Sequence, residues 1–377
     1  MTSDPTAIPE PEFCFFDPLK EDLPSEAWQQ LCDDALDPNP FFSPAFLCPY
    51  LRHMEHRPVR LAVVRDGRTG VWLVAAPVGR RRLGLALPTA TVWATDYSPL
   101  GTPLMHPQAG PDAVDAFLKG AAGSGALLAI PYLPLASRTA SRLSASGAVR
   151  ITVTAREKRS AHDAGPKGEE QLQAAFSGKR RKEMRRLLRR LGDEHETSFE
   201  SVTGAGVPAA FDAFLRLEAS GWKGRSGTAL SSRSQTEAFA KSAIANLAGG
   251  NCVRIDQLKV GEALVAALVL IQNRGHVFSW KIAFDESRAR FSPGAQIALH
   301  ALRENLAMPG FKGADSLAVP GHSMIEPLWR GRVETATLLG SQGFGGRLMT
   351  FLGEADLTAK RGLRRGLRAV KKRLGRT

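Results

Sequence analysis

One continuous stretch between residues 252 and 306 restricts the possible folds more than any other part of this 377-residue chain. Residues 252–260, 263–272 and 276–284 read as three strands of an antiparallel meander, because apolar or alternating runs are separated by glycine-containing turns. A helix over 293–306 and a short strand over 313–318 follow. This order predicts an α/β fold, α+β in layout, with a mixed central sheet.

The turn between the third strand and the helix carries the best functional signal. A serine and a proline stand where a helix would begin, and helix N-termini bind phosphate through unpaired N–H groups and partial positive charge. Two arginines precede the turn and could reach the same anion. The candidate cofactor-binding residues are Arg288, Arg290, Ser292, Pro293, Gly294 and Ala295. The alternative is an ordinary capped helix, since the turn holds a single glycine.

The rest of the pattern predicts two domains joined by a linker. Helices are expected at 25–36, 43–54, 111–122, 136–146, 179–191, 208–219 and 234–247, and strands at 60–64, 70–77, 126–131 and 199–202. We expect an N-terminal arm over 1–24, a first domain over 25–154, a polar linker over 155–170, a second domain over 171–350 and a basic tail over 351–377.

Positive charge is concentrated in two short segments. The chain has a net charge of +13, but residues 179–190 hold eight Lys and Arg with one Glu, and residues 360–376 hold nine with no acidic residue. Without these segments, 33 basic and 36 acidic residues remain, a net charge of −3. The nearly neutral body argues against broad nucleic-acid binding and favours two local contacts with anions.

Both basic segments read as amphipathic helices. An apolar stripe runs from Met184 to Leu191 in the first, which could contact an anionic acceptor, nucleic acid or lipid, or could present a solvated face. In the second, Leu363, Leu367, Val370 and Leu374 follow i, i+4, i+7, i+11 spacing. Residues 357–377 could therefore lie on an anionic membrane surface, or form a disordered basic tail.

The four cysteines show no CxxC pair and no histidines at metal spacing, so neither a disulfide framework nor a metal site is expected. The first 16 residues do not resemble a signal peptide, and no run of 18 apolar residues occurs. We therefore expect a cytoplasmic protein, with peripheral attachment to the inner membrane surface as a further expectation from the tail.

Six short blocks in the second half of the chain occur in a characteristic order. They are Lys179–Arg181, Leu217–Lys223, Trp280–Asp285, Ser292–Gly294, Asp315–Ala318 and Pro320–Trp329. Together they resemble the acetyltransferase domain of the BioF2-like, or CelD/BcsL, type within the GCN5-related N-acetyltransferase (GNAT) superfamily. The resemblance covers roughly residues 170–335 and extends loosely to Pro40–Phe46. That family is similar in turn to the Fem peptidyltransferases, which carry two such domains in tandem.

The resemblance implies two tandem GNAT-like domains and an acyltransferase that uses acetyl-CoA or another acyl-CoA without a metal. It implies a sugar amine or hydroxyl as acceptor, in polysaccharide (for example cellulose) or cell-envelope biosynthesis. One alternative is a Fem-like transferase that uses aminoacyl-tRNA, although the sequence does not interleave basic and aromatic residues as RNA readers do. Another is a catalytically degenerate protein that binds an anionic surface.

Direct acyl transfer requires a base for the acceptor proton and stabilisation of the leaving thiolate. Asp285 at a strand end, Asp315 on the next strand and His322 in the following loop are the candidate catalytic residues. Each also has a structural interpretation: capping a turn, pairing with a basic residue, or standing in a loop.

The candidate acceptor-binding residues are Glu218, Trp222, Lys223, Lys281 and Trp329. Aromatic faces suit sugars and acyl chains, but both tryptophans could equally belong to the core. If Lys281 points inward, it needs Asp285 or Asp315 as a partner.

Overall fold

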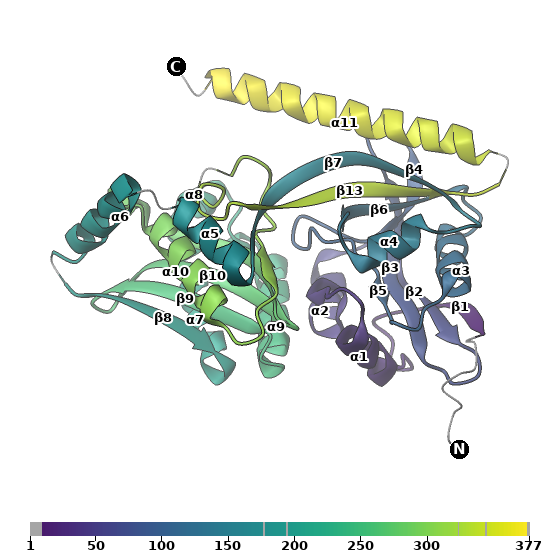
Figure 1. Cartoon of the computed structure of the whole chain (residues 1–377), viewed down its shortest axis with the longest axis horizontal. Helices are drawn as coiled ribbons and strands as arrows, with labels where there is room; N and C mark the ends of the chain where they lie inside the picture. Colours follow the sequence, from purple (N-terminus) through teal and green to yellow (C-terminus); the bar gives the residue numbers. More distant parts are fainter. Residues whose placement is uncertain (1–9, 176–177, 194, 323, 344, 375–377) are drawn as a thin grey trace. The chain divides into compact units, whose positions relative to one another are not determined.

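The computed structural model describes residues 10–175, 178–193, 195–322, 324–343 and 345–374 (Figure 1). The chain divides into two compact units, each assembled from separate stretches of sequence. Unit 1 comprises residues 1–42, 57–157 and 334–377, and unit 2 comprises residues 43–56 and 158–333. Strands β7 (Arg150–Asp163) and β13 (Gly331–Ser341) each contribute residues to both units.

Unit 1 is a mixed sheet with helices packed on it. Its other strands are β1 (Pro11–Phe16), β2 (Val59–Asp66), β3 (Trp72–Arg82), β4 (Pro88–Val92), β5 (Leu104–Met105) and β6 (Leu127–Pro134). Its helices are α1 (Ser25–Asp34), α3 (Pro111–Ala122), α4 (Arg138–Ser144) and α11 (Gly346–Leu374). The strand order is β1-β2-β3-β4-β6-β13-β7, with β5 paired to β3. Strands β4 and β6 are parallel, whereas β1, β2 and β3 are joined by antiparallel pairing.

Unit 2 is built around the meander that the sequence predicts. Its strands are β8 (Thr197–Thr203), β9 (Val253–Val260), β10 (Ala263–Asn273), β11 (His276–Phe284) and β12 (Gly313–Asp315). Its helices are α2 (Pro44–Met54), α5 (Gly165–Ala175), α6 (Gly178–Leu191), α7 (Val207–Ser220), α8 (Trp222–Arg225), α9 (Ser234–Gly249) and α10 (Pro293–Ala307). The strand order is β7-β12-β11-β10-β9-β8, in which β11 and β12 are parallel.

Helices cover both faces of the unit 2 sheet. Helix α10 packs on β9, β10 and β11 on one face, and α7 packs on the same strands from the other (Figure 1). Ile297, Leu302 and Trp329 are fully buried in the α10 layer. In the α7 layer, Phe211 and Phe239 surround Trp280 with ring centroids 6.3 Å away. These two apolar layers fix the sheet against α10 and therefore position the turn that precedes this helix.

The predicted α/β fold with mixed central sheets is confirmed, and so are the meander, the helix after it and the basic helix over 179–191. The boundaries differ. Residues 155–170, expected as a linker, form the end of β7 and the start of α5, and the expected arm over 1–24 contains β1. Polar residues are abundant in β7 because only part of this strand is buried, which gives it the composition of a linker.

The expected domain limits at 25–154 and 171–350 are also wrong, because two segments belong to the other unit. Helix α2 joins unit 2, where Phe46 and Tyr50 pack edge-on against Phe239. The chain after residue 333 joins unit 1, where β13 pairs with β6, and residues 351–374 of the expected tail over 351–377 continue α11, while 375–377 lie outside the described residues. No helix within the described residues is both long and apolar enough to span a membrane.

Candidate active site

The parallel strands β11 and β12 separate shortly after they pair. His276, Val277 and Phe278 pair with β12, which then ends at Asp315, whereas β11 continues to Phe284. The register between β10 and β11 also shifts so that Trp280 has no opposite residue, which is a β-bulge. Bulges redirect strands and are common beside active sites. The second half of β11 therefore has backbone groups that β12 does not occupy.

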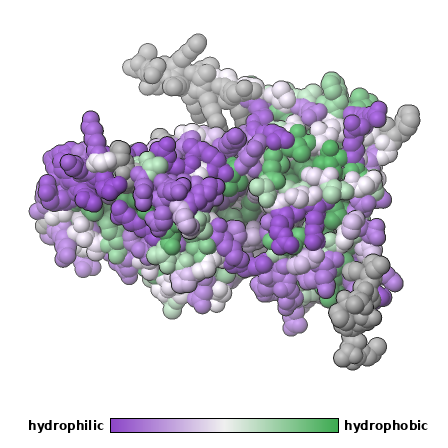
Figure 2. All heavy atoms as spheres, in the orientation of Figure 1, coloured by the Kyte–Doolittle hydropathy of each residue, from purple (hydrophilic) through white to green (hydrophobic). Residues whose placement is uncertain are grey.

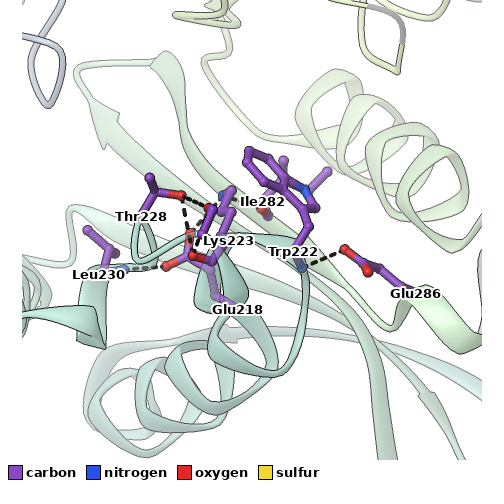
Figure 3. A network of polar contacts seen from close by, with 8 residues as sticks. Glu218, Trp222, Lys223, Thr228, Leu230, Ile282 and Glu286 are labelled. Atoms are coloured by element: carbon purple, nitrogen blue, oxygen red, sulfur yellow. Dashed lines mark hydrogen bonds and ion pairs between the residues drawn. The ribbon is translucent and has the colours of Figure 1, made fainter. Parts of the chain in front are cut away.

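A partly buried ion pair lies against this part of β11. The ammonium of Lys223 donates to Glu218 Oε1 at 2.7 Å and to the carbonyl of Ile282 at 3.1 Å (Figure 3). Glu218 is 4% exposed, and its second oxygen accepts the Leu230 N–H at 2.8 Å. Because both oxygens of Glu218 are engaged, Lys223 is held in one position and covers a carbonyl on the β11 strand.

Glu286 connects this region to the turn before α10. It lies in the 3-10 helix η4 (Glu286–Phe291), and its Oε1 accepts the Trp222 N–H at 2.7 Å (Figure 3). Its other oxygen pairs with Arg225. Glu286 thus ties α8, which carries an indole that is 57% exposed, to the segment that leads into α10. The sequence pattern did not identify Glu286 or Arg225 as residues of the site.

A hollow of about 520 Å³ lies between α6 and the start of α10. Its lining residues are Arg180, Glu183, Met184, Arg186, Leu187, Arg190, Arg290, Phe291, Ser292 and Ala295. Glu183 forms a two-point ion pair with Arg186 at 2.7–2.8 Å, which neutralises one of the four arginines. The lining therefore keeps an excess of positive charge, and we refer to this hollow as the arginine pocket.

Backbone amides contribute less to the arginine pocket than a glycine-rich turn would. Pro293 has no N–H, and the amides of Ala295 and Gln296 donate to the Ser292 carbonyl at 3.0 and 3.1 Å. Ser292 has φ 55° and ψ 47°, a left-handed conformation that glycine adopts more readily. Its hydroxyl does not cap the helix, unlike in the alternative of an ordinary capped helix. Guanidinium groups, rather than amides, are therefore the main donors for an anion here.

Two contacts hold the basic helix α6 beside α10. The Gln296 side chain donates to the Met184 carbonyl at 2.9 Å, and the Met184 side chain is buried in the core. Further arginines of α6 approach α10 at Arg303, whose pKa is lowered by burial and then by Arg185 and Arg181. Like charges crowd each other at this surface, a situation that a bound anion relieves.

The structure separates the candidate cofactor-binding residues. Arg290, Ser292 and Ala295 line the arginine pocket, whereas Arg288 points to Asp285 with an Nε–Oδ2 distance of 3.5 Å. Gly294 has a packing role, because a Cβ atom there would lie 2.6 Å from the Met324 sulfur. The sequence did not identify Arg180 and Arg190 as residues of the pocket. They lie in the basic helix, but residue spacing does not show which strand or helix the basic helix packs against.

The three candidate catalytic residues have different surroundings. Asp285 caps η4 by accepting from the Ser287 N–H and hydroxyl, at 2.9 and 2.7 Å. Asp315 is buried and pairs with Arg159 at 2.6 Å, so both carboxylates have the structural partners that were considered as alternatives. The pKa of His322 is lowered by partial burial and by the nearby Lys223 ammonium, which keeps its imidazole neutral and able to accept a proton.

The acceptor candidates divide in the same way. Trp329 is fully buried, and its indole N–H donates to the Ala298 carbonyl at 3.3 Å, so it is a core residue and cannot line an open pocket. Lys281 lies 5.7 Å from the centroid of the Trp280 ring, and the carboxylate of Asp315 is engaged by Arg159 instead. Trp222 is exposed, and Glu218 and Lys223 lie together beside β11. Among the described residues, no group of three or more His, Cys, Asp or Glu could hold a metal ion.

Comparisons with known proteins agree with this geometry. Residues 178–319 match the model of the acetyltransferase (GNAT) domain family Acetyltransf_6. The fold is similar to FemX, with a TM-score of 0.55 at 10% identity over 88% of this chain and 98% of that chain. It is also similar to the C-terminal domain (DUF2156) of a protein named as a lysylphosphatidylglycerol synthetase from Agrobacterium fabrum, with a TM-score of 0.52 at 15% identity over 87% and 94%.

At these identities the structural similarities show the fold alone, and no curated protein matches the chain. The domain match covers the stretch from α6 to the end of β12, which contains the arginine pocket, the β11–β12 split and the Lys223–Glu218 pair. Residues 178–319 therefore match an acetyltransferase (GNAT) domain, the kind of domain that transfers acyl groups.

Proposed function

We propose that the protein transfers an acyl group, acetyl in the simplest case, from acyl-CoA to an amine or hydroxyl. The observation that carries the proposal is the arginine pocket at the start of α10. Helix α10 comes after β11, the strand that separates from β12. The pyrophosphate of coenzyme A fits a pocket with several guanidinium groups, because each phosphate accepts charge-assisted hydrogen bonds.

The transfer itself would take place along the half of β11 that does not pair with β12. The acceptor nitrogen or oxygen attacks the thioester carbonyl, the C–S bond breaks, and coenzyme A leaves as a thiolate. His322 is the proposed base for the acceptor proton, since its lowered pKa keeps it neutral at physiological pH. Lys223 adds positive charge to this region and would favour the negative charge that develops on the thioester oxygen and the leaving sulfur.

We further propose a saccharide acceptor, in polysaccharide or cell-envelope biosynthesis, and reaction in the cytoplasm. The exposed indole of Trp222 supports this choice, because aromatic faces bind the apolar faces of sugar rings. Glu286 holds the backbone of Trp222 in place, which fixes the point on α8 from which the indole extends.

Titration calorimetry with acetyl-CoA, followed by detection of free thiol with a panel of amino sugars, tests the proposal. We expect saturable binding of acetyl-CoA and acceptor-dependent release of coenzyme A. A matched variant, Trp222→Ala, should retain acetyl-CoA binding and lose acceptor-dependent release. Absence of acetyl-CoA binding at about millimolar concentration would contradict the proposal. A Kd of this size corresponds to a binding free energy of only roughly −4 kcal/mol.

A second candidate is aminoacyl transfer from a charged tRNA. It is favoured by the arginines of α6 that lie outside the arginine pocket, near Arg303, and could contact further phosphates. Filter binding with tRNA distinguishes the two donors. Binding of tRNA at physiological salt that is lost in the Arg181→Ala, Arg185→Ala variant, with no binding of acetyl-CoA, would support this candidate over the first.

A further inference from the structure

Helix α11 of unit 1 has one buried side. Gly346, Thr350, Gly353 and Leu357 are buried at i, i+4, i+7, i+11 spacing, which is one face of a helix. Leu357 joins a small core cluster with residues of β6 and β13, and the Thr350 hydroxyl donates to Ser341 at 2.9 Å. The first three turns of α11 are therefore anchored, and their opposite side is free of these contacts.

The opposite side of α11 is apolar as well. Leu348, Phe351, Leu352, Leu363 and Leu367 have exposed fractions of 61%, 67%, 40%, 53% and 57%. Small residues, Ala355 and Ala359, continue the stripe between Leu352 and Leu363. Figure 2 shows hydrophobic residues gathered where the first half of α11 lies in Figure 1. Exposed apolar stripes of this extent indicate an interaction surface.

A second element adds to this surface. The carboxylate of Asp356 accepts four successive N–H groups of the β3–β4 loop, from Gly84, Leu85, Ala86 and Leu87, at 2.8–3.0 Å. These hydrogen bonds hold the loop against α11, and a Cβ atom at Gly84 would collide with the Asp356 backbone. Leu85, which is 43% exposed, is thereby fixed beside the stripe, since Asp356 follows Leu352 by one helical turn.

Charge indicates what covers the stripe. Residues 360–376 contain nine Lys and Arg and no acidic residue. Lys360 donates to the Leu83 carbonyl at 3.3 Å and Arg361 to the Arg156 carbonyl at 2.8 Å, so these two cations face unit 1. The seven further basic residues come after Arg361 in the sequence. A second copy of this helix would bring like charges together, whereas an anionic lipid surface complements them.

We propose that α11 and the β3–β4 loop form a docking surface for an anionic lipid bilayer. Leu348, Phe351, Leu352 and Leu85 enter the interfacial region of the bilayer, and the basic C-terminal half of α11 lies along the lipid phosphates. The surface belongs to unit 1 and uses no residue of the acyl-transfer site, so it does not depend on the proposed reaction. It extends the tail interaction expected over 357–377 to the anchored start of the helix.

Co-sedimentation of the full chain with vesicles tests the proposal, using phosphatidylcholine alone and phosphatidylcholine mixed with phosphatidylglycerol. We expect binding to the mixed vesicles that weakens as salt rises, because the lipid charges are screened. The Leu348→Ser, Phe351→Ser variant should bind about tenfold more weakly, since two exposed apolar side chains are removed. Leu85→Ser should weaken binding to a smaller extent.

Leu19→Ser is the matched control, because Leu19 is 43% exposed in unit 1 but lies outside α11 and the β3–β4 loop. If the double variant unfolds at a lower temperature than the wild type, Leu363→Ser replaces it, since Leu363 lies beyond the buried stripe. Equal binding of the variants and the wild type, or no preference for phosphatidylglycerol, overturns the proposal. A dimer in ultracentrifugation that Phe351→Ser dissociates, without vesicle binding, would instead assign the stripe to a contact between copies of the chain.

Discussion

Replacing Arg290 and Arg288 separately by alanine provides a sharp test of the donor site. The two arginines are two positions apart in η4, and the sequence does not distinguish them as phosphate ligands. In the structure, Arg290 lines the arginine pocket, whereas the Arg288 side chain lies against Asp285. We expect Arg290→Ala to weaken acetyl-CoA binding and Arg288→Ala to leave it nearly unchanged.

The magnitude follows from the charge of the pocket. Two unit charges 4 Å apart attract by about 4 kcal/mol at an effective dielectric constant of about 20, and by about 1 kcal/mol in water. Arg290 is exposed, and three other arginines remain in the lining after its removal, one of them neutralised by Glu183. We therefore expect a loss of about 1.4 kcal/mol, equivalent to about a tenfold rise in Kd.

Calorimetric titration of acetyl-CoA at low and at high salt measures both variants. The difference in Kd between the two variants should become smaller as salt rises, because exposed charges are screened over about 10 Å at 0.1 M ionic strength. Arg190→Ala should behave like Arg290→Ala, since both line the same hollow from opposite elements. If Arg290→Ala and Arg190→Ala both bind acetyl-CoA with the affinity of the wild type, the arginine pocket is not the donor site.

Three further perturbations give distinct outcomes. Burial lowers the pKa of His162 to about 4, so below pH 6.5 the unfolded chain binds a proton that the folded chain does not. The free energy of unfolding, measured by urea titration, should therefore fall by roughly 3 kcal/mol between pH 6.5 and 4. His162→Gln should remove that part of the decline. Lys223→Met removes a positive charge that lowers the pKa of His322, so an NMR titration of this imidazole should move to higher pH, while Lys223→Arg should not shift it. Asp356→Ala removes the acceptor of four amides and should cost about 1–2 kcal/mol of unfolding free energy, more than Asp356→Asn, which keeps one acceptor oxygen; an Asp356→Asn variant as stable as the wild type would show that the carboxylate charge is unimportant.

Local pattern predicted the elements of the site well. The meander, the helix after Ser292 and the basic helix were all expected within a few residues of their observed limits, because alternation, turns and 3.6-residue periodicity are local properties. The proposed position of the donor site at the start of α10 follows from the same signals. The family resemblance over roughly residues 170–335 agrees with the domain match over 178–319, while its BioF2-like subtype and its acceptor stay proposals.

Partner choice was not predictable in the same way. Trp222 and Trp329 look equivalent in sequence, but one is exposed on α8 and the other is buried beneath α10. Asp315 is a candidate base in the sequence, but in the structure it pairs with Arg159 of β7, which lies 156 positions earlier in the chain. Glu286 gave no signal, because an acidic residue in a turn is common and its partners lie more than 60 positions earlier. Each of these outcomes depends on pairing between distant segments.

Sequence by itself determined the α/β class, the meander and the helix that begins beside a cluster of arginines, because backbone preferences and apolar periodicity act over a few residues. Only the tertiary structure decided the composition of the two units, the arginines that share a pocket and the apolar side of α11 that stays exposed. Helix α2 belongs to unit 2 although its neighbours in sequence belong to unit 1, and the end of the chain belongs to unit 1. Burial of apolar surface drives such assignments, and it depends on which surfaces meet rather than on their order in the chain.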